Sequence, residues 1–468
     1  MELAGKRVFI LGLDQGVVSA AQFLTDQKVR VTVFARTPRS IHEKVLASLK
    51  KISCDVQWGE VEEKRLCEAG LLVAAPGYRF YRWPLSLARR KGVPICSLLE
   101  LAGSFYKKPV IAVTGSNGKT STIVLLQAFL KKGGVSHAVA GGSFASYFDL
   151  LQEKGNVDYF VLETGSFELE GTQKFHPWIA VFLNVGAEHR DRHGTLKKYL
   201  EAKGKIFANQ QKGDFIVYRH DSKLIAAMLS EKKAVVTTVP FCSSKKISPG
   251  IYRDGKKLVY GDKGKEESYS LEDFQLKGVH NIENLMAAIV VARLCGVSAG
   301  TIRETIGDLR WLPHRLERTD EIQGVTFYND AKSTNTVATA WALGSFTDKV
   351  ILIMGGRWRG GSDLEGLTPF IRSKVKILVI IGSNRMVFHK NLGDLVPTFV
   401  VPKIADAVEL AYKKAITGDT VLFSPAAPTE FSVHPDFRAR GEDFKKAVNS
   451  LKESLVKKRL RSSRQERV

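Results

Sequence analysis

Short apolar runs alternate with helical stretches along most of the chain. Most of these runs are continuously apolar, which is typical of strands that are buried on both faces of a parallel sheet. The predicted strands lie at residues 8–13, 29–34, 71–75, 110–114, 159–163, 180–185, 350–354, 377–381 and 420–423. Helical stretches such as residues 282–294 separate them. The pattern predicts an α/β fold with mostly parallel sheets covered by helices.

Two interruptions of this rhythm divide the chain. One lies at residues 103–108, and the other at residues 310–313, where Trp311-Leu312-Pro313 ends a helical stretch. A chain of 468 residues is also too long for one average core. We therefore predict three α/β domains, at residues 1–106, 107–310 and 311–468. The lysine- and glycine-rich residues 232–265 are expected to form strands and turns at an edge of the middle domain.

The composition is that of a soluble globular protein, with 44% hydrophobic and 25% charged residues. No apolar stretch reaches the ~18 residues of a membrane span, and the first residues lack the apolar core of a signal peptide. The five cysteines are scattered and form no C-x-x-C pair, which argues against disulfides and structural zinc. We therefore expect a cytoplasmic protein with reduced thiols and no membrane span.

The net charge of +22 allows three interpretations. It can reflect a solvated lysine-rich surface, a positive field that steers anionic substrates to their clefts, or nucleic-acid binding. The most basic stretch, residues 457–464, has no interleaved aromatic side chains, so we expect a solvated tail there. Weak adhesion of this tail to RNA or to a membrane is the alternative interpretation, and nucleic acid is not an expected partner of the protein.

The most informative local pattern follows the predicted strand at residues 110–114. A glycine-containing loop leads into a helix, and its residues are Gly115, Ser116, Asn117, Gly118, Lys119, Thr120 and Ser121. Such a loop points backbone N–H groups at phosphates, while the lysine adds a charge and the threonine a hydroxyl for Mg²⁺. It is shorter than the full G-x-x-x-x-G-K-[ST] pattern, because Val113 stands where the first glycine would be. The alternative, an ordinary turn with an exposed lysine, explains fewer of these features, so we predict ATP binding.

Polar residues also follow the next two strands of the middle domain. Glu163 ends one strand, and Asn184 closes the other shortly before His189. Parallel strands present their carboxyl ends at one edge of a sheet, so these side chains are expected beside the loop and able to hold Mg²⁺ on ATP. Histidine is unusual for Mg²⁺, and His189 taken alone is more typical of a loop surface. Lys203 taken alone looks like one more solvated helix lysine.

The first domain opens as a strand, a glycine turn and a helix, but the dinucleotide fingerprint G-x-G-x-x-G fails around Gly12. The second strand is followed by Arg36 instead of the acidic residue that holds a ribose diol. An arginine suits a phosphate or a stacked base. A nucleotide-like ligand without nicotinamide and a purely structural domain both remain open on these residues.

Several motifs together resemble the Mur ligase and folylpolyglutamate synthase superfamily. They are Thr114-Gly115-Ser116-Asn117-Gly118-Lys119-Thr120, Asn184 with His189-x-Asp191, His280-Asn281-x-x-Asn284, Pro313-His314-Arg315-Leu316-Glu317 and Asn329-Asp330-Ala331-Lys332-Ser333-Thr334-Asn335. The ending, with Ser424-Pro425-Ala426-Ala427 and Asp436-Phe437, looks most like the MurD family, and the D-N-P-R motif of the MurE branch is absent. The resemblance spans residues 5–446. It implies a Rossmann-like first domain, a central P-loop ATPase-like domain and a Rossmann-like third domain.

The resemblance implies four catalytic residues, which are Lys119, His189, Lys203 and Lys332. Lys119 would grip the β- and γ-phosphates, and Lys332 would bridge the γ-phosphate and the reacting carboxylate. The nucleotide would also contact Asn281, Arg315 and Asp330. Two Mg²⁺ ions would be organised by Thr120, Glu163, His189 and Lys203, with Lys203 carbamylated by CO₂ so that its amine becomes an anion.

Two substrate sites are implied as well. UDP-N-acetylmuramoyl-L-alanine would lie against Asp14, Gln15, Arg36, Pro76, Gly77 and Ser143, and glutamate would lie against Arg359, Thr429 and Phe437. The usual glutamate loop Gly-Gly-x-Asp-Lys-Gly is Gly-Gly-Arg-Trp-Arg-Gly here, so either Arg357 or Arg359 can serve. The usual Glu-x-Ser-Ser-Phe-Gln-Leu also carries Gly165 and Glu168 at its third and sixth positions. The handedness of the glutamate cannot be read from these changes.

The implied activity is ATP-dependent ligation of glutamate, with D-glutamate expected, to UDP-N-acetylmuramoyl-L-alanine by a monomer in peptidoglycan precursor synthesis. The reaction would pass through an acyl phosphate. A folylpolyglutamate synthase-like ligase is an alternative because it shares the phosphate loop. The C-terminal motifs and the first domain of this chain match such a ligase less well. A P-loop ATPase acting on nucleic acid would use the positive charge, and a non-catalytic nucleotide-binding protein would bind ATP without turnover.

Overall fold

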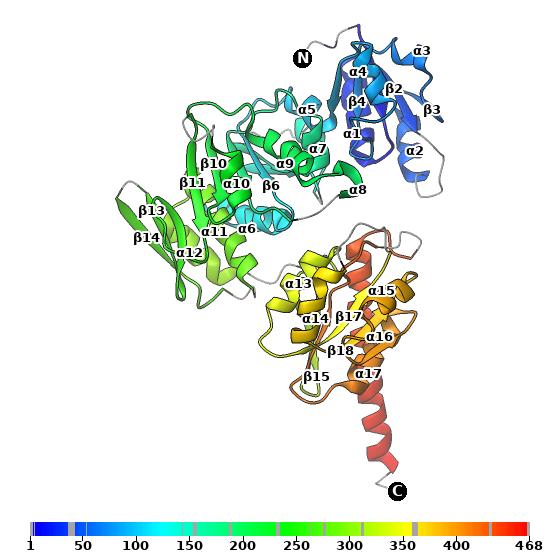
Figure 1. Cartoon of the computed structure of the whole chain (residues 1–468), viewed down its shortest axis with the longest axis vertical. Coiled ribbons are helices and arrows are strands. Elements are labelled where there is room, and N and C mark those ends of the chain that lie inside the picture. The colour runs from blue at the N-terminus through cyan, green and yellow to red at the C-terminus, as the bar shows by residue number, and fades with distance from the viewer. Residues whose placement is uncertain are drawn as a thin grey trace. The chain divides into compact units, whose positions relative to one another are not determined.

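The computed structural model describes residues 3, 5–35, 43–52, 54–142, 144–152, 157–186, 190–230, 235–262, 264–274, 278–309, 313–357, 364–429 and 433–465. The chain packs into two compact units (Figure 1). One contains Met1–Asp273 and Glu283–Gly307, and the other contains Phe274–Ile282 and Asp308–Val468. The predicted three-domain division at residues 1–106, 107–310 and 311–468 stays a prediction, because this packing does not separate the first two predicted domains.

The first sheet of the larger unit is parallel, with the strand order β3-β2-β1-β4-β5. Its strands are β1 (Arg7–Leu11), β2 (Arg30–Ala35), β3 (Asp55–Trp58), β4 (Leu71–Ala74) and β5 (Ile95–Ser97). Its helices are α1 (Gln15–Asp26), α2 (Glu43–Lys51), α3 (Glu63–Leu66), α4 (Leu85–Arg90) and α5 (Leu98–Gly103). Strands β1 and β4 are almost wholly buried, as their continuous apolar sequences predict.

The second sheet of the larger unit has the order β14-β13-β12-β11-β10-β9-β6-β8-β7. Its strands are β6 (Val110–Thr114), β7 (His137–Ala140), β8 (Tyr159–Glu163), β9 (Ile179–Phe182), β10 (Phe215–Arg219), β11 (Thr237–Cys242), β12 (Gly250–Asp254), β13 (Lys257–Asp262) and β14 (Lys265–Ser270). Only the β12–β13 and β13–β14 pairs are antiparallel among the described strands of this sheet. The prediction of edge strands near residues 232–265 is therefore confirmed.

Helices of this second sheet are α6 (Lys119–Lys132), α7 (Ser166–Glu170), α8 (Arg190–His193), α9 (Leu196–Gly204), α10 (Lys223–Met228), α11 (Val279–Leu294) and α12 (Ala299–Asp308). Short 3₁₀ turns lie at Asp149–Leu151 and Lys205–Phe207. Helix α6 starts directly after the loop that follows β6, as the sequence predicts. Its apolar face is buried through Ile123, Leu126 and Phe129.

The smaller unit holds a sheet with the order β15-β16-β20-β17-β18-β19, which is parallel except for β15–β16. Its strands are β15 (Glu317–Ile322), β16 (Val325–Asn329), β17 (Val350–Gly355), β18 (Val375–Ile381), β19 (Thr398–Val400) and β20 (Thr420–Phe423). Its helices are α13 (Thr336–Gly344), α14 (Thr368–Lys374), α15 (Arg385–Leu392), α16 (Ile404–Lys414) and α17 (Phe437–Gln465), with a 3₁₀ turn at Glu365–Leu367. Together the three sheets confirm the predicted α/β class.

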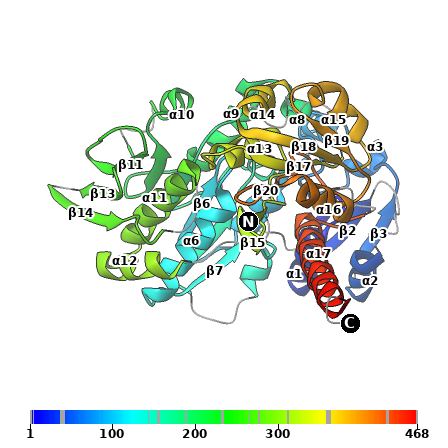
Figure 2. The same cartoon turned by 90° about the horizontal axis from the view of Figure 1, so that it is seen from below.

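The basic segment at residues 457–464 is helical, because α17 runs through it as one long helix (Figure 2). Phe444 and Val448 are fully buried in the core of the smaller unit, and Leu451 and Leu455 pack against that core. This apolar spacing of three and four residues anchors the first turns, and the basic end continues the same helix. None of the described helices is long and apolar enough to cross a membrane.

Candidate active site

The strand order places three sequence motifs of the middle sheet at one edge. β6 lies between β8 and β9, with Val113 opposite Glu163 and Thr114 opposite Phe182. The loop after β6, the last residue of β8 and the chain after β9 therefore meet at the carboxyl ends of parallel strands, where ligands bind in such sheets. This convergence was predicted from the sequence.

The loop is tied down by Asn184. The Asn117 N–H donates to Asn184 Oδ1 at 2.9 Å, and Asn184 Nδ2 donates back to the Asn117 carbonyl at 3.0 Å. The Ser116 N–H donates to the Asn184 carbonyl at 3.1 Å. Gly118 adopts a left-handed conformation (φ +88°) as the N-cap of α6, and a Cβ there would collide with Asn284 Oδ1. A glycine is therefore required at this position for conformation and for space.

Two side chains of the first turn of α6 contact the loop and the end of β8. Lys119 Nζ folds back over the loop and donates to the carbonyls of Gly115 (2.8 Å) and Ser116 (3.0 Å). The Thr120 hydroxyl donates to Glu163 Oε2 at 2.8 Å. A hydroxyl and a buried carboxylate beside a helix N-terminus are the oxygen ligands that Mg²⁺ prefers. These residues therefore fit a magnesium–nucleotide site.

The Glu163 carboxylate also needs the glycine at position 142. A Cβ on Gly142 would lie 2.5 and 2.6 Å from the two carboxylate oxygens, and Gly142 has φ +56°. The backbone carbonyl of Glu163 accepts the Tyr147 hydroxyl at 2.8 Å. The carboxylate is therefore positioned by close backbone approach on one side and by Thr120 on the other.

Lys203 is buried, which rules out a solvated helix lysine. The residue is 2% exposed, and its Nζ donates to the Gly115 carbonyl at 2.9 Å and to Thr114 Oγ1 at 3.3 Å. It lies four residues after Tyr199 on α9, so both side chains share one helix face. The Tyr199 hydroxyl lies 2.8 Å from Ser116 Oγ, and the Lys203 ammonium lies 5.0 Å from the Tyr199 ring centre. Helix α9 thus presents Lys203 directly under the loop.

Glu168 stands where the usual Glu-x-Ser-Ser-Phe-Gln-Leu motif has glutamine, and it lies close to Gly165. A Cβ on Gly165 would lie 2.6 Å from Glu168 Oε2, so the two sequence departures occur together in space. Burial raises the pKa of Glu168, partly offset by a backbone hydrogen bond and by Lys119. Sequence reasoning did not assign this residue a role.

In the first sheet, the turns after β1 and β4 approach each other closely. A Cβ on Gly12 would lie 2.5 Å from Ala75 Cβ. Asp14 is the N-cap of α1 and accepts the Val17 N–H at 2.9 Å, and Gln15 is exposed at the first turn of that helix. Pro76 and Gly77 follow Ala75, the first residue after β4. The predicted uridine-site residues of these two turns therefore lie at one edge of the sheet.

Arg192 fastens the turn after β4 to the middle sheet. Its guanidinium donates to the carbonyls of Pro76 (2.5 Å) and Tyr78 (2.6 Å), and its Nε and Nη2 donate to Glu170 Oε2 at 2.9 and 2.7 Å. Both side chains of this ion pair are 5% exposed. The role of Arg192 was missed in the sequence, although its position three residues after His189 gave a signal.

The smaller unit forms a second group of predicted residues. Asp330 follows β16 and accepts the Ser424 hydroxyl at 2.8 Å and the Leu316 N–H at 3.3 Å. Burial raises the pKa of Asp330 to about 6, although these hydrogen bonds and Arg315 oppose the rise. Burial, with Arg315 nearby, lowers the pKa of His280 to about 4, and its ring stacks on Trp341 with the centres 5.6 Å apart. Asn281, the next residue, is buried.

The predicted glutamate-side residues lie in the same unit. The Lys332 ammonium lies 4.0 Å from the centre of the Phe437 ring, and Thr429 is buried. Arg440 is 3% exposed, and it donates from Nη1 to the Ala427 carbonyl and from Nη2 to the Ala331 carbonyl, both at 3.0 Å. It therefore joins the strand ends that carry Lys332 and Thr429, a role that was not predicted.

Four predicted site residues lie outside the described residues: Arg36, Ser143, His189 and Arg359. Arg357 is described, and it is exposed with its N–H bonded to the Pro428 carbonyl at 3.2 Å. Among the described residues, no cluster of three or more His, Cys, Asp or Glu side chains is arranged to hold a metal ion. The metal site is therefore described only through Thr120 and Glu163.

Comparison with known families accounts for most of the chain. The N-terminal domain of MurD-like Mur ligases matches residues 6–97, the Mur ligase middle domain matches residues 113–292, and the Mur ligase glutamate ligase domain matches residues 314–427. The chain belongs to the Mur ligase family. The predicted family is thereby confirmed.

Individual relatives agree with this placement. The UDP-N-acetylmuramoylalanine–D-glutamate ligase of Geotalea daltonii is 35% identical over 451 residues, which cover 96% of this chain and 99% of the relative. The ligase of the same name from Geobacter sp. (strain M21) is 36% identical, with 97% and 99% covered. The structure of MurF ligase from Thermotoga maritima in complex with ADP aligns with a TM-score of 0.58 at 16% identity, covering 96% of this chain and all of that one. That structural likeness supports the fold.

Proposed function

We propose that the protein is an ATP-dependent ligase that joins D-glutamate to UDP-N-acetylmuramoyl-L-alanine in peptidoglycan precursor synthesis. The observation that carries the proposal is the convergence of Lys119, the Thr120–Glu163 pair and buried Lys203 on one phosphate loop. Relatives with this activity in their names cover nearly the full chain, which supports the choice of substrates. ATP hydrolysis on nucleic acid would not require a buried Lys203 or the glutamate-type ending.

ATP would lie with its phosphates on the loop from Gly115 to Ser121 and on the N-terminus of α6. Lys119 would move from the loop carbonyls to the β- and γ-phosphates. Asn281, Arg315 and Asp330 would hold the rest of the nucleotide. Asp330 is buried, so its carboxyl group would be shielded from water in this role.

The first chemical step would activate the carboxylate of the L-alanyl group. One of its oxygens attacks the γ-phosphorus, the bond from that phosphorus to the bridging oxygen breaks, and ADP leaves. Two anions must approach each other, so Lys119 and Lys332 would offset their repulsion. Mg²⁺ held by Thr120, Glu163 and His189 would supply further positive charge at the phosphates.

The second step would form the amide bond. The glutamate amine attacks the carbonyl carbon of the acyl phosphate, and the tetrahedral intermediate loses a proton and expels phosphate. Thr429, Phe437 and either Arg357 or Arg359 would orient the glutamate. Carbamylated Lys203 would help to hold a second Mg²⁺, because the carbamate turns a buried cation into an anionic oxygen ligand.

The first sheet would bind the uridine nucleotide through Asp14, Gln15, Arg36, Pro76 and Gly77, with Ser143 on the muramoyl side. The predicted domain at residues 1–106 would then bind this nucleotide, the domain at residues 107–310 would bind ATP, and the domain at residues 311–468 would bind glutamate. We further propose that the enzyme acts as a monomer in the cytoplasm.

The test is phosphate release from ATP with purified protein. Release should require UDP-N-acetylmuramoyl-L-alanine and D-glutamate together, should be far slower with L-glutamate, and should stay at background with either substrate alone. Lys119→Ala should lower the rate at least about 10²-fold, because it removes a charge that acts at every step. Rapid ATP turnover without the two substrates would overturn the proposal.

A further inference from the structure

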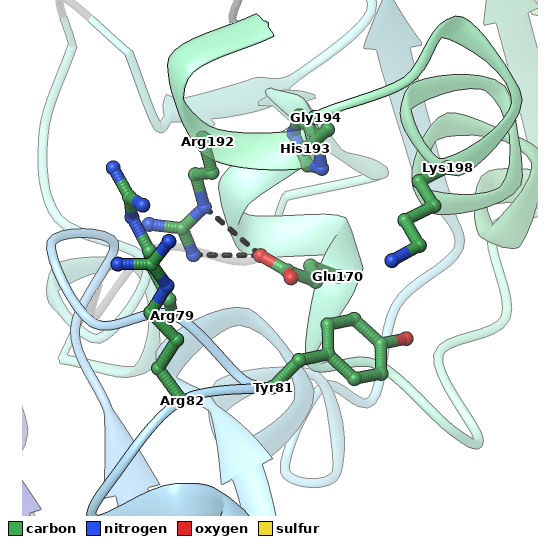
Figure 3. A pocket seen from close by; sticks show the side chains of 8 residues that line it. All are labelled: Arg79, Tyr81, Arg82, Glu170, Arg192, His193, Gly194 and Lys198. Atoms are coloured by element: carbon green, nitrogen blue, oxygen red, sulfur yellow. Dashed lines mark hydrogen bonds and ion pairs between the residues drawn. The ribbon is translucent and has the colours of Figure 1, made fainter.

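A cavity of about 290 Å³ lies between the chain after β4 and the helices α7 to α9 (Figure 3). Four basic side chains line it together with Tyr81 and Glu170: Arg79, Arg82, Arg192 and Lys198. All of them belong to the larger compact unit. The cavity is distinct from the phosphate loop, none of whose residues lines it.

The charges of this cavity do not balance. Glu170 is the single carboxylate of the described lining, and the Arg192 guanidinium already binds it through two hydrogen bonds. The ion pairs found among the described residues include none of Arg79, Arg82 or Lys198. Three cationic side chains therefore share a small volume without a carboxylate to neutralise them.

Three of the four basic groups of the cavity lie together, and the fourth faces them from the other side. Figure 3 shows the guanidinium groups of Arg79 and Arg82 beside that of Arg192, while the Lys198 ammonium lies on the other side of the Glu170 carboxylate, above the Tyr81 ring in this view. Like charges repel unless an anion lies between them. Guanidinium groups also match phosphate oxygens bidentately, so their clustering favours a phosphate over a monoatomic anion.

The floor of the cavity is rigid. Arg192 is held by two backbone carbonyls and by the Phe167 ring, whose centre lies 4.2 Å from the guanidinium carbon. His193 is buried, with its Nε2 3.0 Å from Ser166 Oγ. The floor of the cavity is therefore held in place by hydrogen bonds and packing, whereas Tyr81, Arg82 and Lys198 are exposed at its rim. A small cationic cavity with a fixed floor suits a compact phosphate group.

We propose that this cavity binds a small phosphate-bearing anion at a site separate from the ATP and uridine-nucleotide sites. The guanidinium groups of Arg79 and Arg82 contact the phosphate, and Lys198 adds positive charge from the other side of the cavity. The proposal goes beyond the ligase reaction, and its test does not use ligase activity. Inorganic phosphate and the phosphate group of a phosphorylated sugar share this chemistry, and the test separates these two sources.

The test is calorimetric titration of the whole protein with inorganic phosphate and, separately, with a hexose 1-phosphate. The protein is saturated beforehand with a non-hydrolysable ATP analogue, Mg²⁺ and UDP, so that the nucleotide sites are filled. One equivalent of at least one probe should bind. The probe that binds more tightly identifies the source of the phosphate.

Matched variants distinguish a specific phosphate site from attraction by the general positive charge of the protein. Arg79→Gln/Arg82→Gln should weaken binding at least tenfold, and Lys198→Gln should weaken it severalfold. Lys131→Gln/Lys132→Gln removes the same charge from the exposed end of α6 and should change binding less than twofold. Thermal midpoints equal to that of the wild type would show that the variants fold. No binding by the wild type, or equal weakening by both double variants, would overturn the proposal.

Discussion

Replacement of Gly142 by alanine is expected to disable the metal–nucleotide site without unfolding the protein. The new Cβ would lie 2.5 and 2.6 Å from the Glu163 carboxylate oxygens. A carbon and an oxygen need more than about 3 Å, so the carboxylate must move by at least about 0.5 Å, and a misplacement of about 1 Å at a reacting site can cost about 10²-fold in rate. The displacement also breaks the 2.8 Å hydrogen bond from Thr120. We therefore expect kcat to fall between about tenfold and 10²-fold and the Mg²⁺ requirement to rise.

Gly134→Ala provides the matched control. Gly134 also has a left-handed backbone (φ +72°), but a Cβ there meets nothing within 4 Å. Both variants should lose about 1–2 kcal/mol of stability from the strained backbone. Their thermal midpoints should therefore be similar, while phosphate release, measured over a Mg²⁺ titration with both substrates, should fall only in Gly142→Ala. Activity of Gly142→Ala within twofold of Gly134→Ala would refute the argument that Glu163 is positioned by this close approach.

Three further predictions concern buried charged groups. Lys203→Ala should be almost inactive, and formate or acetate should restore part of the phosphate release by supplying the missing anion; an active variant that ignores these carboxylates would exclude a carbamate. Burial raises the pKa of Asp330 from 3.8 to about 6. The protonated form is thus favoured in the folded state, and about 3 kcal/mol of stability present below pH ~4 is lost as the pH rises through ~6. The free energy of unfolding of the wild type and of Asp330→Asn, measured in urea from pH 4 to 7.5, should differ by an amount that changes across this pH range. A difference that stays constant would contradict the raised pKa of Asp330. Arg192→Met should lower the free energy of unfolding by about 1–3 kcal/mol, because buried Glu170 loses both hydrogen bonds that it accepts from Arg192. Adding Glu170→Gln should recover part of this loss, and additive effects of the two substitutions would contradict an Arg192–Glu170 interaction.

The sequence alone predicted the parts of the fold that depend on local patterns. Continuous apolar runs located the central strands, because a strand buried on both faces excludes polar side chains. The loop from Gly115 to Ser121 was identifiable because its glycine, lysine and threonine positions are set by backbone conformation and phosphate chemistry. Glu163 was placed beside it, since parallel strands end at one edge of a sheet. Predictions for Arg36, Ser143, His189 and Arg359 rest on the sequence and the family alone.

The tertiary structure decided what neighbours each charged side chain has. Lys203 looks like a surface lysine in the sequence, and only the packing of α9 under the phosphate loop buries it against Thr114 and Gly115. Arg192 meets the carbonyl of Pro76 across 116 positions of the chain, a distance that no local pattern encodes. The raised pKa of Asp330 likewise comes from its burial after β16, beside Ser424, which follows β20. Local sequence fixes backbone conformation and period, whereas burial and ion pairing depend on segments that folding brings together from far apart in the chain.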